Sequence, residues 1–544
     1  MSRLHQPAKI LLARSYFNKG RVVSMRRQWS FLLGIALVSL LIFSRPLVAD
    51  VRLPAVFTDN AVLQRDIPVP VWGWADEGEQ VTVKVGDQTK TATPEAKTGK
   101  WTVKLDPLPV GGPLTLTVSG KNTITLKNVL VGEVWICSGQ SNMQMSVSGV
   151  GGAKDEIAAA NYPKIRLISV PQRGTATPQD DFKGRWDECS PQTVGGFSAA
   201  GYFFGRELFK NLAVPIGLIH CSYGGSSCET WVNRSVLDGE PSFKPMLDRY
   251  DRELASYNEA TAKANHEKQM ADWKKAVAKA KAAGKVAPKP PRSPSDPHTN
   301  NQCPANLYNG MLYPVLPYGI RGAIWYQGET NAGRAYQYRT LFPTLIKSWR
   351  AEWQEGEFPF YFVQLANFMA VRPEPSDSAW AELREAQSLT LQVPATGQAV
   401  IIDIGEAGNI HPKNKQDVGK RLALWALAKT YGKDVLYSGP TYKSQEIQGD
   451  KIALSFDSIG GGLVAKGGDQ LKGFAIAGSD KKFVWADARI EGDKIIVSSP
   501  KVKSPAAVRY AWADNPECNL YNQADLPASP FRTDDWPGIT IGNK

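Results

Sequence analysis

Short apolar stretches alternate with longer amphipathic stretches through residues 130–440. Strands that alternate with helices lie parallel to one another, because each helix crosses back over the sheet before the next strand begins. The strand candidates include KIRLISV, VPIGLIHCSYGG, RGAIWYQGE, FPFYFVQLA and QAVIIDIG, and the helix candidates include AAGYFFGRELFKNL, YRTLFPTLIKSWRAEW and NKQDVGKRLALWALAKTYG. The sequence therefore predicts an α/β domain with a doubly wound, mainly parallel sheet.

Two regions with a different pattern flank this segment. Residues 50–129 and 441–544 contain short alternating stretches separated by Gly, Asp and Asn turns, which is typical of all-β sandwiches. We therefore expect an N-terminal β domain, an α/β domain and a C-terminal β domain. Residues 250–296 add an Ala-, Lys- and Glu-rich helical stretch with a Pro-rich return loop, and a solvated insertion is favoured there over a lid or docking arm.

The first 49 residues have the pattern of a targeting segment. Arg26 and Arg27 precede the apolar run WSFLLGIALVSLLIF, and small residues follow as far as Ala49. A basic end, a short apolar core and a small residue at the cleavage point make up a secretory signal peptide. We expect the true start at Met25, cleavage near Ala49 and export to the periplasm or the outside of the cell. The alternative is an uncleaved membrane anchor, because the run is near the lower length limit for a span.

The net charge of +12 does not indicate a polyanionic partner. Residues 1–49 hold eight bases and no acid, and residues 263–292 hold nine bases against two acids. The rest of the chain is slightly negative, so no groove for nucleic acid is expected.

The six cysteines show no metal-ligand spacing, and we expect no metal site. In an exported chain they could pair, and Cys221 and Cys228 are close enough to close a small loop. Cys137 lies in an apolar strand and is expected to be buried.

Four predicted strands are followed by polar turns that carry reactive or hydrogen-bonding groups. These are Ser141 in GQSNM, Gly224 and Gly225 in YGGSSCETW, Gln327, Glu329 and Asn331 in WYQGETN, and His411 in NIHPKNKQ. Ligands of open α/β sheets bind at the carboxyl edge of the strands, so these groups are expected to lie together.

A serine hydroxyl becomes a nucleophile only beside a base, which is usually histidine. The other four histidines, at positions 5, 266, 298 and 220, lie in the leader, the charged insertion, the Pro-rich loop and the end of an apolar strand. His411 precedes a predicted helix at the edge where Ser141 should emerge. The hydroxyl, the imidazole, the amide and the flexible backbone N–H groups are the parts of an acyl-transfer site.

These blocks, in this order, resemble those of the SGNH (GDSL-like) hydrolases, and specifically the sialate O-acetylesterase group. FTDNAVLQRDIPVPVWGWADEGEQVTV, WAELREAQ and YNQADLPASPFRTD also resemble segments of that group, so the resemblance covers nearly the whole mature chain. It implies an SGNH-type α/β fold with flanking β regions, and an exported carbohydrate esterase that removes O-acetyl groups from sugars and needs no metal or organic cofactor.

The resemblance also implies roles for individual residues. Ser141 matches the nucleophile and His411 matches the base. The oxyanion hole would comprise the N–H of Ser141, the N–H of Gly224 or Gly225, and the side-chain amide of Asn331. Supporting or substrate-binding positions are expected at Gln140, Gln327, Glu329 and Arg384, the last of which could instead form a buried pair with Glu385.

One position departs from the family pattern. The aspartate that SGNH enzymes commonly place three residues before the histidine is replaced by Gly408. Asp403 is the candidate acid, although it could equally be a structural residue at a strand end. Glu406 and Asp417 are also near in sequence, and a backbone carbonyl could orient the imidazole in a Ser-His dyad.

The resemblance does not distinguish between sugar substrates, because both sialate and acetylated polysaccharides such as xylan have esterases of this type. The non-enzymatic alternative is an exported carbohydrate-binding protein with a degenerate site, but a pure binder has no need of Ser141, Asn331 and His411 together. A peptidase or thioesterase would need a recognition motif that is not evident. The flanking β domains could be carbohydrate-binding modules, although structural supports are favoured, and the oligomeric state is not determined by the sequence.

Overall fold

The computed structural model describes residues 50–544, of which 51–544 form one compact unit. The expected signal peptide, the start at Met25 and the cleavage point at Ala49 lie outside the described residues. Within the described part of the chain, no helix combines the length and the apolar character needed to span a bilayer.

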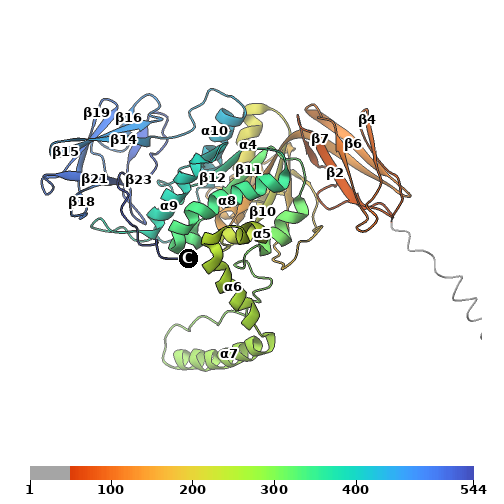
Figure 1. Ribbon diagram of the computed structural model, residues 1–544, viewed down its shortest axis with the longest axis horizontal. Coiled ribbons are helices and arrows are strands. Elements are labelled where there is room, and N and C mark those ends of the chain that lie inside the picture. The colour runs from red at the N-terminus through yellow and green to blue at the C-terminus, as the bar shows by residue number, and fades with distance from the viewer. Residues whose placement is uncertain (1–49) are drawn as a thin grey trace, which may run out of the picture. The chain divides into compact units, whose positions relative to one another are not determined.

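A mainly parallel sheet forms the centre of this unit (Figure 1), with strand order β13-β12-β11-β7-β10-β8-β9. The strands are β7 (Thr123–Gly139), β8 (Tyr162–Ser169), β9 (Asp187–Cys189), β10 (Ile216–Ser222), β11 (Gly322–Tyr326), β12 (Phe360–Val363) and β13 (Thr396–Ala399). Neighbours pair in parallel except β8 and β9, which are antiparallel at one edge. The predicted fold class is confirmed.

Both faces of the sheet are covered, because successive side chains of each strand point to opposite faces and both sets are apolar. Trp135 and Cys137 of β7 belong to the same buried cluster as residues of α4 (Ala199–Leu212) and α10 (Lys415–Trp425). Val134 and Ile136 belong to the cluster of the other face, with α8 (Ala335–Trp353) and α9 (Ala379–Leu389). Shorter helices are α2 (Ser141–Gln144), α3 (Ala153–Ala159) and α5 (Arg234–Asp238).

Strand β7 connects the N-terminal β region to the central sheet. Its first part pairs antiparallel with β6 (Gly111–Ser119), and its second part lies between β10 and β11, where Ile136 is beside Ile219 and Ala323. The expected boundary between residues 129 and 130 therefore falls inside one continuous strand.

The other N-terminal strands belong to two sheets. β2 (Val69–Trp74) pairs with β5 (Lys100–Leu105), β3 (Val81–Val85) lies between β4 (Gln88–Ala92) and β6, and β1 (Val62–Gln64) pairs with β7. Strands β1, β3, β4 and β6 belong to the same sheet as β7, and β2 and β5 form a separate two-stranded sheet. The flanking β character predicted for this region is confirmed.

The C-terminal region is also all-β. One sheet has the order β14-β15-β20-β19, a second has the order β18-β17-β21-β23, and β16 pairs with β22. The strands are β14 (Thr441–Gln448), β15 (Lys451–Asp457), β16 (Leu463–Ala465), β17 (Phe474–Gly478), β18 (Val484–Trp485), β19 (Asp487–Glu491), β20 (Lys494–Ser498), β21 (Pro505–Tyr510), β22 (Leu520–Asn522) and β23 (Phe531–Arg532). The predicted strand QAVIIDIG ends early, at Ala399, because its neighbour β12 ends at Val363, the residue that pairs with Ala399. Val400 and Ile402 then join the apolar cluster of the C-terminal region.

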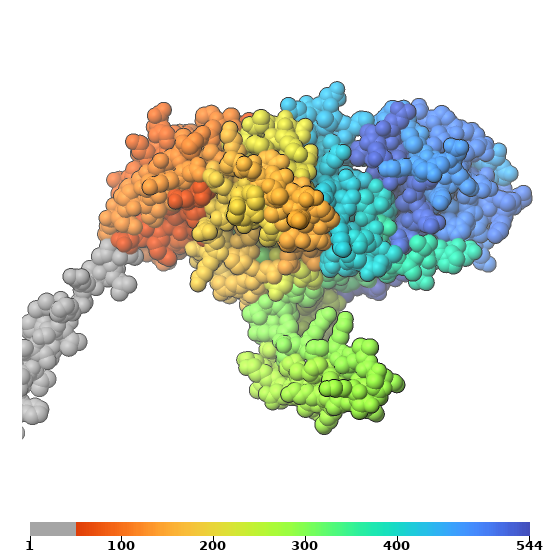
Figure 2. Space-filling view, turned by 180° about the vertical axis from the view of Figure 1, so that it is seen from behind, coloured from red at the N-terminus to blue at the C-terminus, as the bar shows by residue number. Residues whose placement is uncertain are grey.

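The insertion folds as α6 (Lys244–Ser256) and α7 (Glu259–Ala282), followed by an irregular return. No residue of α7 is buried, and Figure 2 shows the segment protruding from the α/β part. This is the arrangement expected of a solvated helical insertion.

All six cysteines are free, so the possible Cys221–Cys228 disulfide is not present. The Cys221 thiol is directed to the carbonyl oxygen of Met311, 3.5 Å away, whereas the backbone N–H of Cys228 donates to Asn331. Cys137 is buried, as expected.

Gly139 ends β7 at a position that excludes a side chain. Its φ is +138°, and a Cβ there would lie 2.2 Å from the carbonyl oxygen of Tyr326. We expect Gly139→Ala to lower the free energy of unfolding in urea by on the order of 2–3 kcal/mol, from backbone strain and overpacking. Gly333→Ala is the matched control, because a Cβ there meets no atom within 4 Å. Equal stability of the two variants would contradict the expectation.

Candidate functional site

The carboxyl ends of three neighbouring strands are joined by backbone hydrogen bonds. After β7, the N–H of Gln140 donates to the carbonyl of Tyr326 at the end of β11 (3.0 Å). The N–H of Tyr223, just beyond β10, donates to the carbonyl of Gly139 (3.1 Å). Ser141 therefore begins helix α2 at the edge where the polar turns meet.

Ser141 and His411 lie in direct contact, although 270 positions separate them in sequence. Ser141 Oγ is 2.8 Å from His411 Nε2, and the imidazole is half-buried in the loop before α10. Burial, with the nearby Lys415 ammonium, holds the pKa of His411 below its ordinary value. The ring is therefore uncharged at neutral pH and able to accept a proton.

Asp403 does not orient this imidazole, which corrects the candidate acid. Its carboxylate forms a two-point ion pair with the guanidinium of Arg421, at 2.5 and 2.7 Å, and accepts a hydrogen bond from the Tyr521 hydroxyl. The reason is that Arg421 projects from α10 toward the carboxyl end of the sheet and takes both oxygens. Asp403 is the structural residue that the sequence left as the alternative.

The other two nearby acids are also engaged elsewhere. Glu406 accepts hydrogen bonds from the N–H of Lys413 and the amide of Asn409, and Asp417 accepts from Asn414. Within residues 50–544, no group forms a hydrogen bond with Nδ1 of His411. Asn409 instead brackets the backbone of His411, accepting from its N–H (3.0 Å) and donating to its carbonyl (2.9 Å).

Asn142 connects the serine turn to the histidine loop. Its amide nitrogen donates to the carbonyl of Ile410 (3.0 Å) and to Glu329 Oε1 (2.6 Å). Its oxygen accepts from the ammonium of Lys415 (2.7 Å), which also donates to the carbonyl of Pro412 (2.7 Å). The carbonyls immediately before and after His411 are thus both fixed by side chains. Sequence reasoning gave Asn142 and Lys415 no role, although GQSN and HPKNK contain them.

The charges behind the site are buried and perturbed. Burial lowers the pKa of Lys415 to about 7 and raises that of Glu329. Glu329 Oε2 is buried without a hydrogen-bond partner, and the Lys415 ammonium lies over the ring of Tyr326, 5.2 Å from its centroid. Glu329 is therefore placed behind the serine turn, in contact with Asn142.

The two glycines expected to supply an oxyanion N–H differ in their contacts. Gly224 lies against Ser141, since a Cβ on Gly224 would be 3.5 Å from that of Ser141, but its N–H donates to the side chain of Gln144 (2.7 Å). Gly225 has a φ of +71°, and its carbonyl accepts from Gln302.

Asn331 is buried, with one amide hydrogen directed to Glu229 (3.0 Å). Its oxygen accepts from the N–H of Cys228 and from Gln327. The second hydrogen of this amide group has no acceptor among residues 50–544. It is the one unassigned donor of the side chain.

Glu229 was missed by sequence reasoning. Its carboxylate is fully buried and paired with the guanidinium of Arg334. Burial alone would raise the pKa of Glu229, but the Arg334 charge and the hydrogen bonds hold it below its ordinary value. Glu229 is therefore an ionised acceptor that fixes the orientation of Asn331.

Three supporting candidates have structural contacts. Gln140 accepts from the N–H of Gly328 (3.3 Å), and the buried Gln327 donates to the carbonyl of Ser226. Arg384 does not reach the site, because it is fully buried and donates to four carbonyls, those of Leu365, Ala366, Ala513 and Asp514. Its neighbour Glu385 pairs with Arg339 and Arg532 rather than with Arg384.

An open groove of about 720 Å³ extends from Ser141 and His411 along the end of β10. His220 lies in it with its ring nitrogens 2.6 Å from Ser222 Oγ and 3.3 Å from Ser169 Oγ. Burial lowers the pKa of His220 to about 4, so this ring is uncharged at neutral pH. The sequence placed His220 at the end of an apolar strand, where packing or a hydrogen bond was expected, and the structure shows hydrogen-bonding contacts.

Comparisons with known proteins agree on one family. Residues 131–266 and 304–427 match the model described as carbohydrate esterase, sialic acid-specific acetylesterase, and the interruption falls in the insertion and its return loop. The chain is 30% identical to sialate O-acetylesterase of Mus musculus, over 92% of this chain and 97% of that protein. It is 29% identical to that of Homo sapiens, over 93% and 97%. A crystal structure of a carbohydrate acetylesterase from Xanthomonas citri matches with a TM-score of 0.75 at 39% identity, over 89% of this chain and all of that one.

Lys415→Met tests how the histidine loop is held. Loss of the ammonium removes two hydrogen bonds and a positive charge near His411, so the pKa of His411 should rise. We expect kcat/KM for a chromogenic acetate to fall by ~10-fold or more. A tenfold fall corresponds to ~1.4 kcal/mol in the activation free energy. The acidic limb of the pH–rate profile should move to higher pH.

Lys420→Met, on the exposed side of the same helix, is the control and should change neither quantity. An acidic limb that stays in place or moves to lower pH in Lys415→Met would refute the role given to Lys415.

Proposed function

The chain belongs to the sialic acid-specific acetylesterase family of carbohydrate esterases and is a carboxylic ester hydrolase, and we propose that it removes O-acetyl groups from sugars with Ser141 as nucleophile and His411 as base. The observation that carries the mechanism is the 2.8 Å separation of Ser141 Oγ and His411 Nε2. The uncharged state of the ring at neutral pH supports the same roles.

The reaction proceeds in two acyl transfers. His411 Nε2 takes the hydroxyl proton as Ser141 Oγ attacks the acetyl carbonyl, and the imidazolium then protonates the departing sugar oxygen. The acetyl group is left on Ser141. A water molecule gives a proton to His411 and attacks this ester, and collapse of the second tetrahedral intermediate returns the proton to Ser141 and releases acetate.

Three donors are available to stabilise the oxyanion. Ser141 supplies the N–H at the start of α2, Gly224 supplies its N–H once Gln144 is displaced, and Asn331 supplies its second amide hydrogen. In other enzymes, removal of one oxyanion-hole donor lowers kcat by ~10²–10³-fold. No carboxylate takes part in this scheme, and the loop fixed by Asn142 and Lys415 holds the imidazole of a Ser-His dyad.

The sugar has two candidates. Sialate follows from the names of the relatives. A neutral acetylated polysaccharide such as xylan is favoured by the groove, because none of the described residues that line it is a lysine or arginine and His220 is uncharged. A sialate carboxylate would find no cation there.

Export is also proposed, on the signal-peptide pattern of residues 1–49. Expression of the full chain in a Gram-negative host should give a soluble periplasmic protein whose N-terminus, by mass spectrometry, is close to Asp50. An intact N-terminus in the membrane fraction would support the anchor instead.

Ser141→Ala tests the nucleophile. Release of acetate from 4-nitrophenyl acetate, acetylated xylan and 9-O-acetylated sialic acid should fall by ~10³-fold or more, because the variant has no hydroxyl to activate. Ser444→Ala, at an exposed position in β14, should retain full activity. Acetate release that is unchanged in Ser141→Ala would overturn the mechanism.

The same panel separates the two sugars. We expect a higher kcat/KM for acetylated xylan than for 9-O-acetylated sialic acid, and a ratio that changes little between low and high NaCl, because no charge pair contributes to binding. Preference for the sialate would exclude the neutral candidate.

A further inference from the structure

A second cleft, of about 580 Å³, lies at the end of the sheet opposite Ser141. Leu316 and Pro317 line it just before β11 begins, whereas Ser141 follows the carboxyl end of β7, which is parallel to β11. No residue lines both the cleft and the groove at Ser141. The cleft is therefore a separate feature, within the size range of ligand sites, ~300–1,000 Å³.

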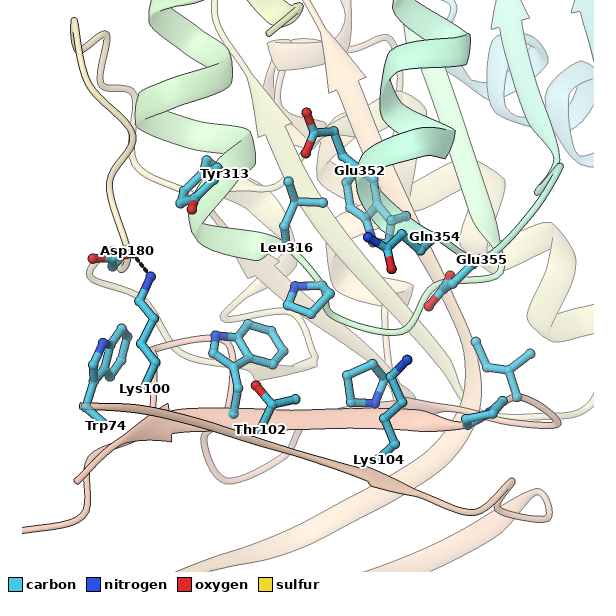
Figure 3. A pocket seen from close by; sticks show the side chains of 16 residues that line it. Trp74, Lys100, Thr102, Lys104, Asp180, Tyr313, Leu316, Glu352, Gln354 and Glu355 are labelled. Atoms are coloured by element: carbon cyan, nitrogen blue, oxygen red, sulfur yellow. Dashed lines mark hydrogen bonds and ion pairs between the residues drawn. The ribbon is translucent and has the colours of Figure 1, made fainter. Parts of the chain in front are cut away.

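The floor of the cleft is one face of the β2–β5 pair (Figure 3). Its cross-strand pairs each place an apolar residue beside a polar one: Pro70 with Lys104, Trp72 with Thr102 and Trp74 with Lys100. Trp74 is half-buried, and Arg52 stacks over its ring, 5.1 Å from the centroid, which restrains its orientation. The strand period of two therefore places these three rings on one face beside three polar side chains, and Trp74 is the most exposed of the rings.

The opposite wall comes from the α/β part. Tyr313 and Gln354 lie across the cleft from the β2–β5 pair, and an ion pair between Lys100 and Asp180 lies at one end (Figure 3). Glu355 lies at the other end, with Oε1 buried and without a hydrogen-bond partner. Burial raises the pKa of Glu355 to about 8, so its carboxyl group is largely uncharged at neutral pH.

Several polar groups of the cleft have unused hydrogen-bonding capacity. Among the described residues, no side-chain hydrogen bond or ion pair engages Thr102, Lys104, Tyr313 or Gln354. Lys100 is neutralised by Asp180, so the cleft has no strong excess of either charge. Indole and phenol rings beside free hydroxyl and amide groups suit a ligand with apolar C–H faces and hydroxyl edges. A pyranose ring has this chemistry.

We propose that this cleft is a second saccharide-binding site, which holds unacetylated neutral sugar residues against Trp74. This goes beyond the proposed function, since the site needs no contribution from Ser141 or His411. Because the two sites lie at opposite ends of the sheet, the cleft retains a long glycan at the enzyme rather than binding the sugar under attack. Tethering of this kind raises the local concentration of further ester groups on the same polymer.

The first experiment is calorimetric titration of the full mature chain with xylohexaose, cellohexaose and mannohexaose, which carry no acetyl group. We expect at least one to bind, and its Kd to rise about tenfold or more in Trp74→Ala. Trp485→Ala removes an indole that is 41% exposed on the C-terminal β region, and it should bind like the unaltered chain.

A second variant guards against misfolding of Trp74→Ala. Thr102→Arg extends a long side chain from an exposed position into the cleft while leaving every ring in place, and it should weaken binding equally. In both variants, the ratio of kcat/KM for acetylated polymer to kcat/KM for 4-nitrophenyl acetate should fall several-fold.

Two results would overturn the proposal. They are no binding of any hexasaccharide at millimolar concentration, and equal binding by the unaltered chain and both cleft variants. The titration is independent of ester cleavage, so a failure of the proposed function would be seen separately, as absence of acetate release with saccharide binding intact.

Discussion

The hydrogen bonds of Asn142 are the constraint on which the site depends. One short side chain, next to the serine, reaches the carbonyl before the histidine, the carboxyl group of Glu329 and the ammonium of Lys415. Burying an ammonium and a carboxyl group is costly unless each finds partners. A buried hydrogen-bond network of this kind allows few alternative conformations. It therefore fixes the positions of Ser141 and His411 relative to each other, although the two residues are far apart in the sequence.

This arrangement also supports the proposed Ser-His dyad, in which no described residue forms a hydrogen bond with Nδ1 of His411. In a serine triad the acid fixes the tautomer and the direction of the imidazole. Here the loop backbone is bracketed by Asn409 and fixed on both sides by Asn142 and Lys415, which restrains the ring through its own peptide groups. The nearest strand-end acid, Asp403, instead joins α10 to the C-terminal β region, because it contacts both Arg421 and Tyr521.

Much of this could be predicted from the sequence, for identifiable reasons. Periodicity shows which faces are buried, so the parallel sheet, α4 and the solvated character of α7 followed from the pattern. The meeting of Ser141 and His411 followed from strand ends sharing one edge. Side-chain partners could not be predicted in this way. The residues next to Asp403 in the sequence do not indicate its ion pair with Arg421, and WAELREAQ does not indicate that Arg384 donates to four backbone carbonyls. The periodicity also did not show where β7 changes its pairing from β6 to β10 and β11. Side chains alternate between the two faces of a strand along its whole length, whichever strands it pairs with.

The continuity of β7 has a consequence for the modularity of the protein. The strand that ends in the turn of Ser141 begins as part of the N-terminal β region, with no linker between the two. Domains that are exchanged between proteins are usually joined by exposed, flexible linkers, where few contacts cross the boundary. Here a cut between residues 129 and 130 would divide β7, so the N-terminal β region and the α/β part cannot be exchanged as separate modules at that border.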